Sequence, residues 1–274
     1  MIIKCIKYQM LNKKKLLLIG KRSFIASNLY KFLKKKINVK IVSFEKFNLL
    51  EDSLIKSFTH ICNCSIKKEY VKEKYLKDND IDRLILNKIK NSKIKYIFLS
   101  SRKVYETKAN IKETSKLLAK ENYSKNKLIT EQFIKKNYQK NYLILRISNL
   151  IGKQIKYNRK VSKNFIDNYF KYKKNDKTIY YENYFKDFLS IDQFNIIFLK
   201  ILKKDLNGVF NVSIGKKIFI SEILKALGKG KILKQFKQKK IIKNDSFYLN
   251  NDKLIKNTKL RLNKKSLLQY CYKM

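Results

Sequence analysis

The sequence predicts an α/β fold, a doubly wound parallel sheet followed by a small C-terminal α+β lobe. Over the first 150 residues, short segments that are apolar along their whole length alternate with segments of helical periodicity. Strands of that kind are buried on both faces, as in a parallel sheet with helices on either side. After about residue 150 the pattern changes to mixed helices and short strands. The predicted division is a sheet domain over 13–150, with 189–213 added, and a smaller lobe over 151–188 and 214–274.

The elements of the sheet domain follow one another in regular alternation. Five short apolar runs predict strands, at 15–20, 39–44, 59–65, 95–101 and 142–148. Helices are predicted between them, at 24–36, 67–91 and 127–138. Proline is absent and glycine numbers six, so the usual marks of turns are missing and these boundaries are approximate.

The composition indicates a folded protein with a surface rich in lysine. The chain has 274 residues, of which 44% are hydrophobic and 13% aromatic, enough to bury a sizeable core. Its formal charge of +45 comes almost entirely from lysines spread along the whole chain. Sequence-specific readers of nucleic acids favour arginine and localised patches. The charge therefore predicts a solvated surface and no specific nucleic-acid partner, although it can help to attract an anionic substrate.

Cysteine and histidine usage argues against a metal site or a disulfide framework. Cys5, Cys62, Cys64 and Cys271 show no C-x-x-C spacing, and His60 is the single histidine. No metal is therefore expected, and a reducing cytoplasmic setting is the default. The longest apolar runs are too short to span a bilayer, and the first residues do not read as a signal peptide. No membrane association is expected.

The turn after the first strand is where a doubly wound fold of the Rossmann type holds a dinucleotide pyrophosphate. It reads Gly20-Lys-Arg-Ser23-Phe-Ile-Ala26, with one glycine where three are usual. Ala26 is acceptable at the third glycine position, because that position governs the packing of the helix against the strand. Ser23 puts a side chain where the backbone should approach the phosphates. The segment fits a dinucleotide site and an ordinary strand–helix turn about equally.

Glu45 is predicted to end the second strand, 25 residues after Gly20. An acidic residue there can accept a hydrogen bond from the ribose 2′-hydroxyl of NAD. A solvated surface glutamate is the simpler interpretation. Arg22 and Lys46 lie close enough in the sequence to favour a 2′-phosphate instead. The residues near the end of the second strand are therefore compatible with either NAD or NADP.

The segment ENYSKNK, residues 121–127, places Tyr123 four residues before Lys127. On a helix such residues share a face, and a lysine ammonium there stabilises the ionised form of a phenol, which makes the tyrosine a usable general acid/base. The same spacing occurs at Tyr30/Lys34, Tyr70/Lys74 and Tyr169/Lys173, as chance predicts in a chain so rich in both residue types. The spacing alone therefore has no discriminating power.

The order of the surrounding segments is more informative. KYIFLSSRKVYE carries Ser101 four residues before Tyr105, ENYSKNKLITEQFI follows, and NYLILRISNLIGK contains Arg146, Asn149 and Gly152. This succession resembles the extended short-chain dehydrogenase/reductases, in particular the NAD-dependent epimerase/dehydratase family that acts on nucleotide sugars. That family has Ser/Thr-x-x-Val-Tyr, a YxxxK helix and Arg-x-x-Asn-x-x-Gly in this order. GKRSFIASNL, Asn79, KDFLSIDQF (186–194) and GVFNVSIGKKIFISEILKAL (208–227) resemble further segments of the family.

The resemblance implies a role for each matching residue. Tyr123 would be the general acid/base at a sugar hydroxyl or carbonyl, and Lys127 would hold the nicotinamide ribose and favour the ionised phenol. Ser101 would hydrogen-bond the same substrate oxygen. The simpler interpretation of Ser101 is a strand-end serine that caps the local backbone. Tyr105 is expected to be a packing residue and not a reacting one. The cofactor, NAD or NADP, would contact Gly20, Arg22, Ser23, Phe24, Ile25, Glu45, Asn63 and Lys127. The substrate, a nucleotide sugar, would contact Arg146, Asn149 and Asp187.

One departure from the family narrows the reaction. Arg102 and Lys103 stand where the family's dehydratases place Asp-Glu, so dehydration is not expected. What remains is a 4-epimerase or a 4-keto reductase, and the short chain and small lobe favour the reductase slightly. The alternative is a catalytically lapsed relative that binds a nucleotide or a protein partner, which Ser23 and the missing glycines motivate. The resemblance also allows a homodimer.

Overall fold

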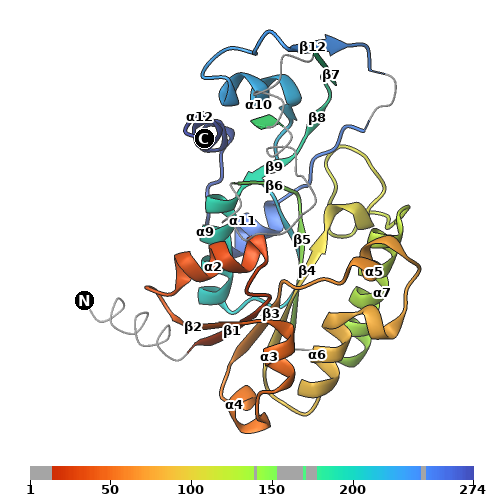
Figure 1. Cartoon of the computed structure of the whole chain (residues 1–274), viewed down its shortest axis with the longest axis vertical. Coiled ribbons are helices and arrows are strands. Elements are labelled where there is room, and N and C mark those ends of the chain that lie inside the picture. The colour runs from red at the N-terminus through yellow and green to blue at the C-terminus, as the bar shows by residue number, and fades with distance from the viewer. Residues whose placement is uncertain (1–13, 139–140, 153–168, 171–177, 242–244) are drawn as a thin grey trace. The chain divides into compact units, whose positions relative to one another are not determined.

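The computed structural model describes residues 14–138, 141–152, 169–170, 178–241 and 245–274. Its centre is a six-stranded sheet of β1 (Lys15–Ile19), β2 (Asn38–Val42), β3 (His60–Asn63), β4 (Lys95–Ser101), β5 (Tyr142–Ile147) and β10 (Gly208–Val212) (Figure 1). The strand order is β10-β5-β4-β3-β1-β2. β1 is parallel to β2 and to β3, and β3 is parallel to β4. The doubly wound parallel sheet predicted from the sequence is confirmed.

The direction of winding reverses between β1 and β3. The chain passes from β1 to β2 on one side, and then continues with β3, β4 and β5 on the other side of β1. In such sheets the connections that leave the two central strands diverge, and ligands bind in the crevice at their carboxyl ends. The turn after β1 and the loop after β3 therefore mark the end of the sheet where a ligand is expected.

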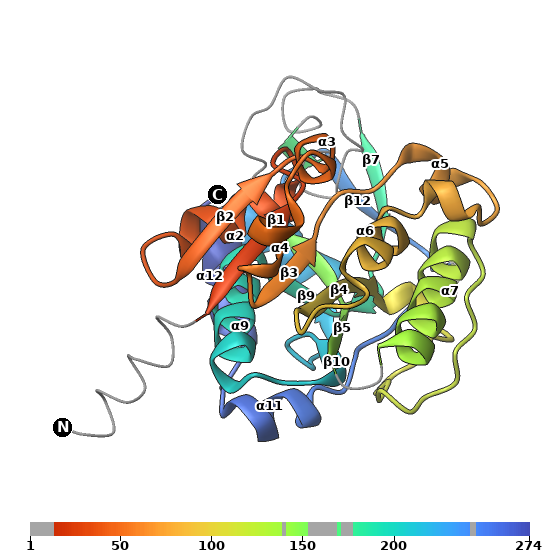
Figure 2. The same cartoon turned by 90° about the horizontal axis from the view of Figure 1, so that it is seen from below.

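Helices cover both faces of the sheet. α2 (Phe24–Leu33) and α9 (Ile191–Lys204) lie on one side, and α6 (Ile81–Ile89) and α7 (Asn122–Asn137) lie on the other (Figure 2). Two short helices, α3 (Phe44–Asn48) and α4 (Asp52–Lys56), contribute to the same core as α6. Further short elements are α5 (Lys68–Lys72) and the 3₁₀ turns η1 (Lys77–Asn79) and η2 (Arg102–Val104).

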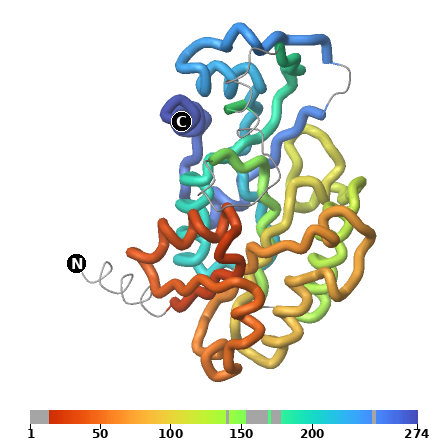
Figure 3. Tube along the Cα trace, in the orientation of Figure 1, coloured from red at the N-terminus to blue at the C-terminus, as the bar shows by residue number. Residues whose placement is uncertain are grey.

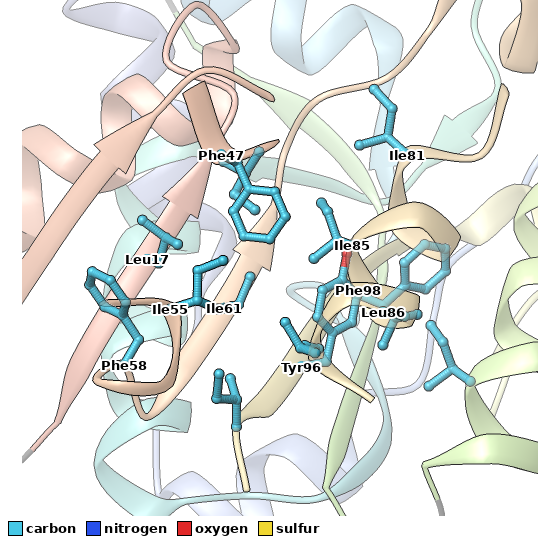
Figure 4. Close-up of a cluster of buried hydrophobic side chains, with 14 of the residues drawn as sticks. Leu17, Phe47, Ile55, Phe58, Ile61, Ile81, Ile85, Leu86, Tyr96 and Phe98 are labelled. Carbon is cyan, nitrogen blue, oxygen red and sulfur yellow. The ribbon is translucent and has the colours of Figure 1, made fainter. Parts of the chain in front are cut away.

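The core on the α6 side explains why the strands are apolar throughout. Alternate strand residues such as Leu17 and Tyr96 meet Phe47 of α3 and Ile85 of α6 in one buried cluster (Figure 4). The residues between them point to the opposite face of the sheet, where Leu18 is equally buried. Burial on both faces leaves no position for polar alternation, and this produces the continuous apolar runs seen in the sequence.

The helical boundaries differ from those predicted, for local reasons. The helix predicted over 67–91 is divided into α5, η1 and α6, because Asp80 caps α6 by accepting a hydrogen bond from the Arg83 N–H at 3.1 Å. α3 and α4 are too short to show helical periodicity. α7 begins at Asn122, earlier than predicted, because Glu121 and Ser124 form a capping box in which the Glu121 N–H donates to Ser124 Oγ at 3.2 Å.

The chain divides into two compact units. The first comprises Met1–Glu106, Lys116–Arg146 and Asn195–Phe210, and the second comprises Thr107–Ser115, Ile147–Phe194 and Asn211–Met274. Figure 3 shows the path of the chain through these segments by colour. Residues 107–115 group with the second unit, outside the division into 13–150 with 189–213 and 151–188 with 214–274, which stays a prediction.

The second unit consists of short paired strands and helices. β6 (Asn149–Ile151) pairs in parallel with β9 (Phe188–Ser190), β7 (Ile179–Glu182) in parallel with β12 (Phe236–Lys239), and β8 (Phe185–Lys186) antiparallel with β11 (Ile218–Phe219). Its helices include α10 (Ile220–Leu227), α11 (Asp252–Thr258) and α12 (Lys264–Tyr272). In the part of the chain that the structure describes, no helix is long and apolar enough to cross a membrane.

One carboxylate links the amino-terminal ends of the central strands. Asp205, which follows α9, lies 2.7 Å from Lys14 Nζ, 2.9 Å from Lys95 Nζ and 3.2 Å from His60 Nε2. The three side chains around it are largely buried. Burial, and next the charge of Lys14, lowers the pKa of His60 from 6.5 to about 4. The ring is therefore neutral in the folded protein at neutral pH.

A buried ion pair holds α7 on the sheet. Arg146 of β5 and Glu131 of α7 are 1% and 0% exposed, and Arg146 Nε donates to Glu131 Oε1 at 3.0 Å while Nη2 donates to Oε2 at 2.5 Å. Ser100 of β4 donates to Glu131 Oε1 at 2.6 Å, and Arg146 Nη1 donates to Tyr105 Oη at 2.8 Å. Two strands are thus tied to one helix by charge-assisted hydrogen bonds.

The His60 environment predicts a loss of stability in mild acid. Because its folded pKa of about 4 lies below the unfolded value of 6.5, only the unfolded chain takes up a proton in that interval. The associated stability is complete above pH 6.5 and is lost as the pH falls towards 4. His60→Gln should abolish this dependence. In urea unfolding, the difference in free energy between the wild type and His60→Gln should shrink by about 2 kcal/mol from pH 7 to pH 4.5. A difference that does not change with pH would mean that folding leaves the pKa of His60 at its unfolded value.

Removal of the Glu131 carboxylate should be strongly destabilising. Glu131→Ala leaves the Arg146 guanidinium buried without its counter-ion, and we expect a loss of about 3–5 kcal/mol in the free energy of unfolding. Lys135→Ala is the matched control, since Lys135 Nζ lies 3.8 Å from the same carboxylate but its side chain is 37% exposed. It should cost less than about 1 kcal/mol. Equal losses in urea unfolding would show that the Glu131–Arg146 pair does not hold α7.

Candidate active site

Gly20 lies at the carboxyl end of β1, where the sheet predicts a ligand crevice. Its φ of +110° is a conformation that side chains rarely adopt, and a Cβ there would stand 2.8 Å from Ser65 Oγ and 2.9 Å from the Ser65 nitrogen. Glycine is therefore required both by the backbone conformation and by the close approach of the loop after β3. The turn is fixed further by the Gly20 N–H, which donates to the Val42 carbonyl at 2.8 Å.

Ser23 occupies the N-cap of α2. Its hydroxyl oxygen accepts a hydrogen bond from the Ala26 N–H at 3.5 Å, so the side chain is turned towards its own helix. No acidic residue lies in the first turn, where Phe24 and Ile25 are half-buried, and Arg22 is exposed beside it. The remaining first-turn N–H groups and the helix dipole make this end of α2 suitable for an anion.

The sequence predicted that Glu45 ends the second strand, and this prediction is wrong. β2 ends at Val42, and Glu45 lies exposed in the first turn of α3. Ser43 stands at the strand end instead and caps α3, because its hydroxyl oxygen accepts a hydrogen bond from the Lys46 N–H at 3.3 Å. The short helix begins immediately after the strand, which is why the acidic residue is displaced from the strand end.

Asn63, the last residue of β3, shapes the loop that faces Gly20. Its amide nitrogen donates to the Ser65 carbonyl at 3.1 Å and to Asp82 Oδ1 at 3.0 Å, and its oxygen accepts from the Ser65 N–H at 2.8 Å. The side chain is buried and its hydrogen bonds are made within the protein. Its predicted contact with a cofactor stays a prediction.

Ser101, Tyr123 and Lys127 come from two elements that pack together. Ser101 is the last residue of β4, and its hydroxyl oxygen accepts a hydrogen bond from the Lys103 N–H at 3.3 Å, so it caps η2 and its own proton can still be donated. α7, which carries Tyr123 in its first turn and Lys127 one turn later, packs against β4 and η2. Tyr123 is half-buried and Lys127 is buried.

The other tyrosines of the YxxxK spacing occupy different settings. Tyr30 lies on α2, away from the end of β4. Tyr70 is buried on α5, which ends before Lys74, and its hydroxyl lies 2.7 Å from Thr130 Oγ1. Tyr169 is buried and stacked on Phe236 at 5.2 Å, and Lys173 lies outside the described residues. Within the described residues, only Tyr123 follows a serine strand and shares a helix with its lysine, as the family pattern requires.

The side chains of two of the three predicted substrate residues are engaged within the protein. Arg146 is engaged by Glu131 and Tyr105 in the core. Asp187 is fully buried, and its carboxylate accepts hydrogen bonds from the N–H groups of Ile214, Gly215 and Leu249 at 3.2–3.3 Å. Burial raises the pKa of Asp187 to about 7, although these donors favour the charged form. Asp187 thus joins three segments of the second unit, and substrate contacts by either residue stay predictions.

A cavity of about 610 Å³ lies within the second unit, and Asn149, the third predicted substrate residue, lines it. Its lining is aromatic and charged, and includes Tyr180, Tyr181, Glu182, Tyr184, Lys186 and Lys239. Lys186 Nζ lies 2.7 Å from Asp245 Oδ2 and 4.6 Å from the centre of the Tyr184 ring. Lys239 Nζ lies 3.5 Å from Glu182 Oε1.

These cavity residues were not predicted as a site. The run TIYYENYFK (178–186) concentrates tyrosines before KDF, and this is the signal that could have identified them. The pairing of β7 with β12 brings Lys239 beside Glu182, which no local pattern indicates. Among the residues that the structure describes, no group of three or more histidines, cysteines and carboxylates could hold a metal ion.

Comparison with known proteins finds one matching family model. Residues 80–213 match the model of the NAD dependent epimerase/dehydratase family. No curated protein matches the chain. The matched segment includes Ser101, Tyr123 and Lys127.

Solved structures with the same fold include enzymes named for different reactions. The UDP-N-acetylglucosamine 4-epimerase from Methanobrevibacter ruminantium M1, in complex with UDP-N-acetylmuramic acid, is 18% identical with a TM-score of 0.75, over 95% of this chain and 96% of that one. The dTDP-glucose 4,6-dehydratase from Bacillus anthracis str. Ames, in complex with NAD, is 16% identical with a TM-score of 0.74, over 95% and 97%. The dTDP-4-dehydrorhamnose reductase ortholog from Clostridium acetobutylicum ATCC 824 is 17% identical with a TM-score of 0.72, over 93% and 98%.

At these identities the structural likeness is one of fold, and it extends over nearly the whole chain. Residues 80–213, which carry Ser101, Tyr123 and Lys127, match the model of the NAD dependent epimerase/dehydratase family, and nearly the whole chain shares the fold of these solved nucleotide-sugar enzymes.

Proposed function

We propose that this protein is an NAD(P)-dependent enzyme of nucleotide sugars, a 4-epimerase or a 4-keto reductase, with Tyr123 as its general acid/base. The observation that carries the proposal is the pair Tyr123 and Lys127 at the start of α7, on a helix that packs against β4 and the turn after Ser101. This arrangement lies within the segment that matches the family model.

The turn after β1 fits a dinucleotide cofactor. The close approach at Gly20 and the N-terminus of α2, which has no acidic residue in its first turn, suit a pyrophosphate. The complex of the dehydratase from Bacillus anthracis with NAD supports this cofactor class. When bound, the nicotinamide supplies the acceptance and return of a hydride. The residues that would hold the cofactor are Gly20, Arg22, Ser23, Phe24, Ile25 and Lys127.

Side chains of the protein, and not the cofactor, would transfer the proton. Tyr123 would take the proton of the sugar 4-hydroxyl in the oxidative direction and return it in the reductive direction. Ser101, whose oxygen already accepts a backbone N–H, would donate its own proton to the same sugar oxygen. The Lys127 ammonium would stabilise the phenolate and donate to a ribose hydroxyl.

The residues after Ser101 support epimerisation or reduction over dehydration. Water elimination needs an acid and a base beside the tyrosine, and the family's dehydratases supply them with Asp-Glu. Here Arg102 and Lys103 form η2, and Lys103 Nζ lies 2.6 Å from Glu121 Oε2. A cation paired with a surface glutamate cannot take the place of the missing carboxylates.

The cavity of the second unit suits the nucleotide part of the substrate. Its volume lies in the range of small-molecule sites. Lys186 and Lys239 would attract the diphosphate, and the three tyrosine rings offer stacking surfaces for a base. The complex of the epimerase from Methanobrevibacter ruminantium with a UDP-sugar supports this ligand class.

A second candidate is a nucleotide binder without catalytic activity. The single glycine and Ser23 in the turn after β1 favour it, because the family's full glycine pattern is absent there. A binding screen of NAD(H) and NADP(H) with UDP-, GDP- and dTDP-sugars, followed by product analysis, separates the candidates. Conversion of a sugar supports the enzyme, and binding without conversion of any sugar supports the second candidate.

Tyr123→Phe should lower turnover by about 10²–10⁴, the usual contribution of a positioned acid/base. It removes one hydroxyl, so thermal stability and cofactor affinity should change little. Ser101→Ala should cost less, and the double variant should lose less than the product of the two single losses, because both groups act on one oxygen. Tyr169→Phe is the matched control: its hydroxyl is buried without a hydrogen-bond partner among the described residues, and its loss should leave turnover unchanged. Equal effects of Tyr123→Phe and Tyr169→Phe on steady-state rates would remove Tyr123 from catalysis.

Lys186→Met should weaken the binding of a nucleoside diphosphate by about tenfold, through loss of one charge-assisted hydrogen bond. The affinity for NAD should stay the same, because the cofactor would be held by the turn after β1. Lys225→Met, on the exposed side of α10, is the control for the loss of one surface charge. Calorimetric titration with UDP, GDP and dTDP measures both affinities. If the two lysine variants bind equally well, the cavity is not the diphosphate site.

A further inference from the structure

Asp82 is a buried carboxylate at the start of α6, outside the residues assigned so far. Its side chain is 6% exposed. One of its oxygens, Oδ1, accepts two hydrogen bonds, from Tyr96 Oη at 2.7 Å and from the Asn63 amide nitrogen at 3.0 Å. β3 and β4 thus both hold this carboxylate in one orientation.

The other oxygen of Asp82 faces the lysine of the candidate catalytic pair. Oδ2 lies 3.8 Å from Lys127 Nζ, and the lysine side chain is 7% exposed. This separation is too long for a hydrogen bond. The attraction is therefore between charges, and it does not occupy a donor of the ammonium group.

Aromatic rings provide the rest of the surroundings of this ammonium. Lys127 Nζ lies 4.4 Å from the centre of the Phe98 ring and 5.5 Å from that of Tyr70. The faces of such rings attract a cation but accept no strong hydrogen bond from it. Lys127 is thus fixed by one carboxylate and two rings. Its ammonium makes no hydrogen bond to any residue that the structure describes, so its N–H donors are available to a ligand.

A lysine this deeply buried depends on its counter-ion. An uncompensated charge at this depth would draw the flexible side chain towards water. A carboxylate close to Nζ opposes this movement. Asp80, the N-cap of α6, is the other carboxylate in this region, but its oxygens accept hydrogen bonds from Tyr75, Thr130 and the Arg83 N–H.

We propose that Asp82 is a positioning residue that holds the Lys127 ammonium in place, so that its N–H donors meet a ribose hydroxyl of the bound dinucleotide. The proposal rests on the proposed function for the role of the ribose. The coupling between Asp82 and Lys127 itself can be measured without any cofactor.

The proposal includes a pH dependence. Burial raises the pKa of Asp82 from 3.8 to about 6, although Lys127 favours its charged form. The neighbouring groups Cys62, Tyr70 and Tyr96 have pKa values raised by burial and remain neutral across this range, and Asp80 faces the same carboxylate from the helix cap. As the pH falls through 6, Asp82 takes up a proton and Lys127 loses its counter-ion.

The first experiment is a double-mutant cycle in urea unfolding of the cofactor-free protein. Asp82→Asn keeps the shape of the side chain but removes its charge, and it should destabilise the fold because the ammonium is left unpaired. Lys127→Met in the same chain should recover part of that loss. Strictly additive losses would overturn the proposal. If Asp82→Asn does not fold, Asp82→Leu/Lys127→Met removes both charges together, and its failure to fold as well would overturn it.

The second experiment measures NAD⁺ affinity by calorimetry for the same variants. Asp82→Asn and Lys127→Met should each weaken binding by about tenfold, the loss of one charge-assisted hydrogen bond, and the double variant should bind no more weakly than Lys127→Met. In the wild type the affinity should fall from pH 7 to pH 5, and in Asp82→Asn it should not. A further loss when Asp82→Asn is added to Lys127→Met would assign Asp82 a merely structural role.

Matched controls lie on the neighbouring turns. Asp78 of η1 and Lys125 of α7 are exposed, and Asp78→Asn and Lys125→Met should change neither the stability cycle nor the affinity. A wild-type protein that binds neither NAD⁺ nor NADP⁺ would contradict the proposed function. The unfolding cycle would then still decide whether Asp82 is the counter-ion of Lys127.

Discussion

The docking of α7 on the sheet is the interaction on which the candidate site depends. Glu131 lies at the middle of that helix and joins Ser100 of β4 to Arg146 of β5 through buried hydrogen bonds. One turn before it lies Lys127, and one turn earlier still lies Tyr123, so a single anchoring point fixes the height and rotation of both side chains. A charged group this deeply buried tolerates little displacement, because any movement leaves its partner unpaired. The rigidity of the acid/base pair therefore comes from residues that never need to touch a substrate.

The two compact units carry different parts of the proposed chemistry. The first contains the six-stranded sheet, the Gly20 turn and the α7 pair, which are built on mostly buried strands and capped helices. The second has two-residue to four-residue strands and a cavity lined by side chains from several of them. The direct link between them in sequence is short: β5 ends at Ile147, and β6, which lines the cavity, begins at Asn149. The unit proposed to carry hydride and proton transfer is thus continuous in sequence with the unit proposed to bind the nucleotide.

The sequence predicted the sheet well because continuous apolar runs have few interpretations. β1 and β4 match their predicted runs closely, and the order of Ser101, the YxxxK helix and Arg146 identified the family. Local patterns failed where the cause was not local. Glu45 was placed at a strand end because strand and helix boundaries without proline or glycine cannot be located from composition. The substrate contacts predicted for Arg146 and Asp187 stay predictions. The buried partners of these two residues, which are Glu131 and the N–H groups of distant segments, lie too far away in sequence to be inferred. The same holds for Asp82, which meets Lys127 only through the packing of α6 against α7.

The Asp205 cluster has a consequence for how this chain can change. Only 21 acidic residues serve 66 basic ones, and at Asp205 a single carboxylate is shared by Lys14, Lys95 and His60. Mutational tolerance should therefore be asymmetric with respect to charge sign. A lysine on the solvated surface can be exchanged for another polar residue at little cost. Asp205 is itself more than half exposed, yet the largely buried Lys14 and Lys95 both depend on its charge, so its replacement should cost more than its exposure suggests.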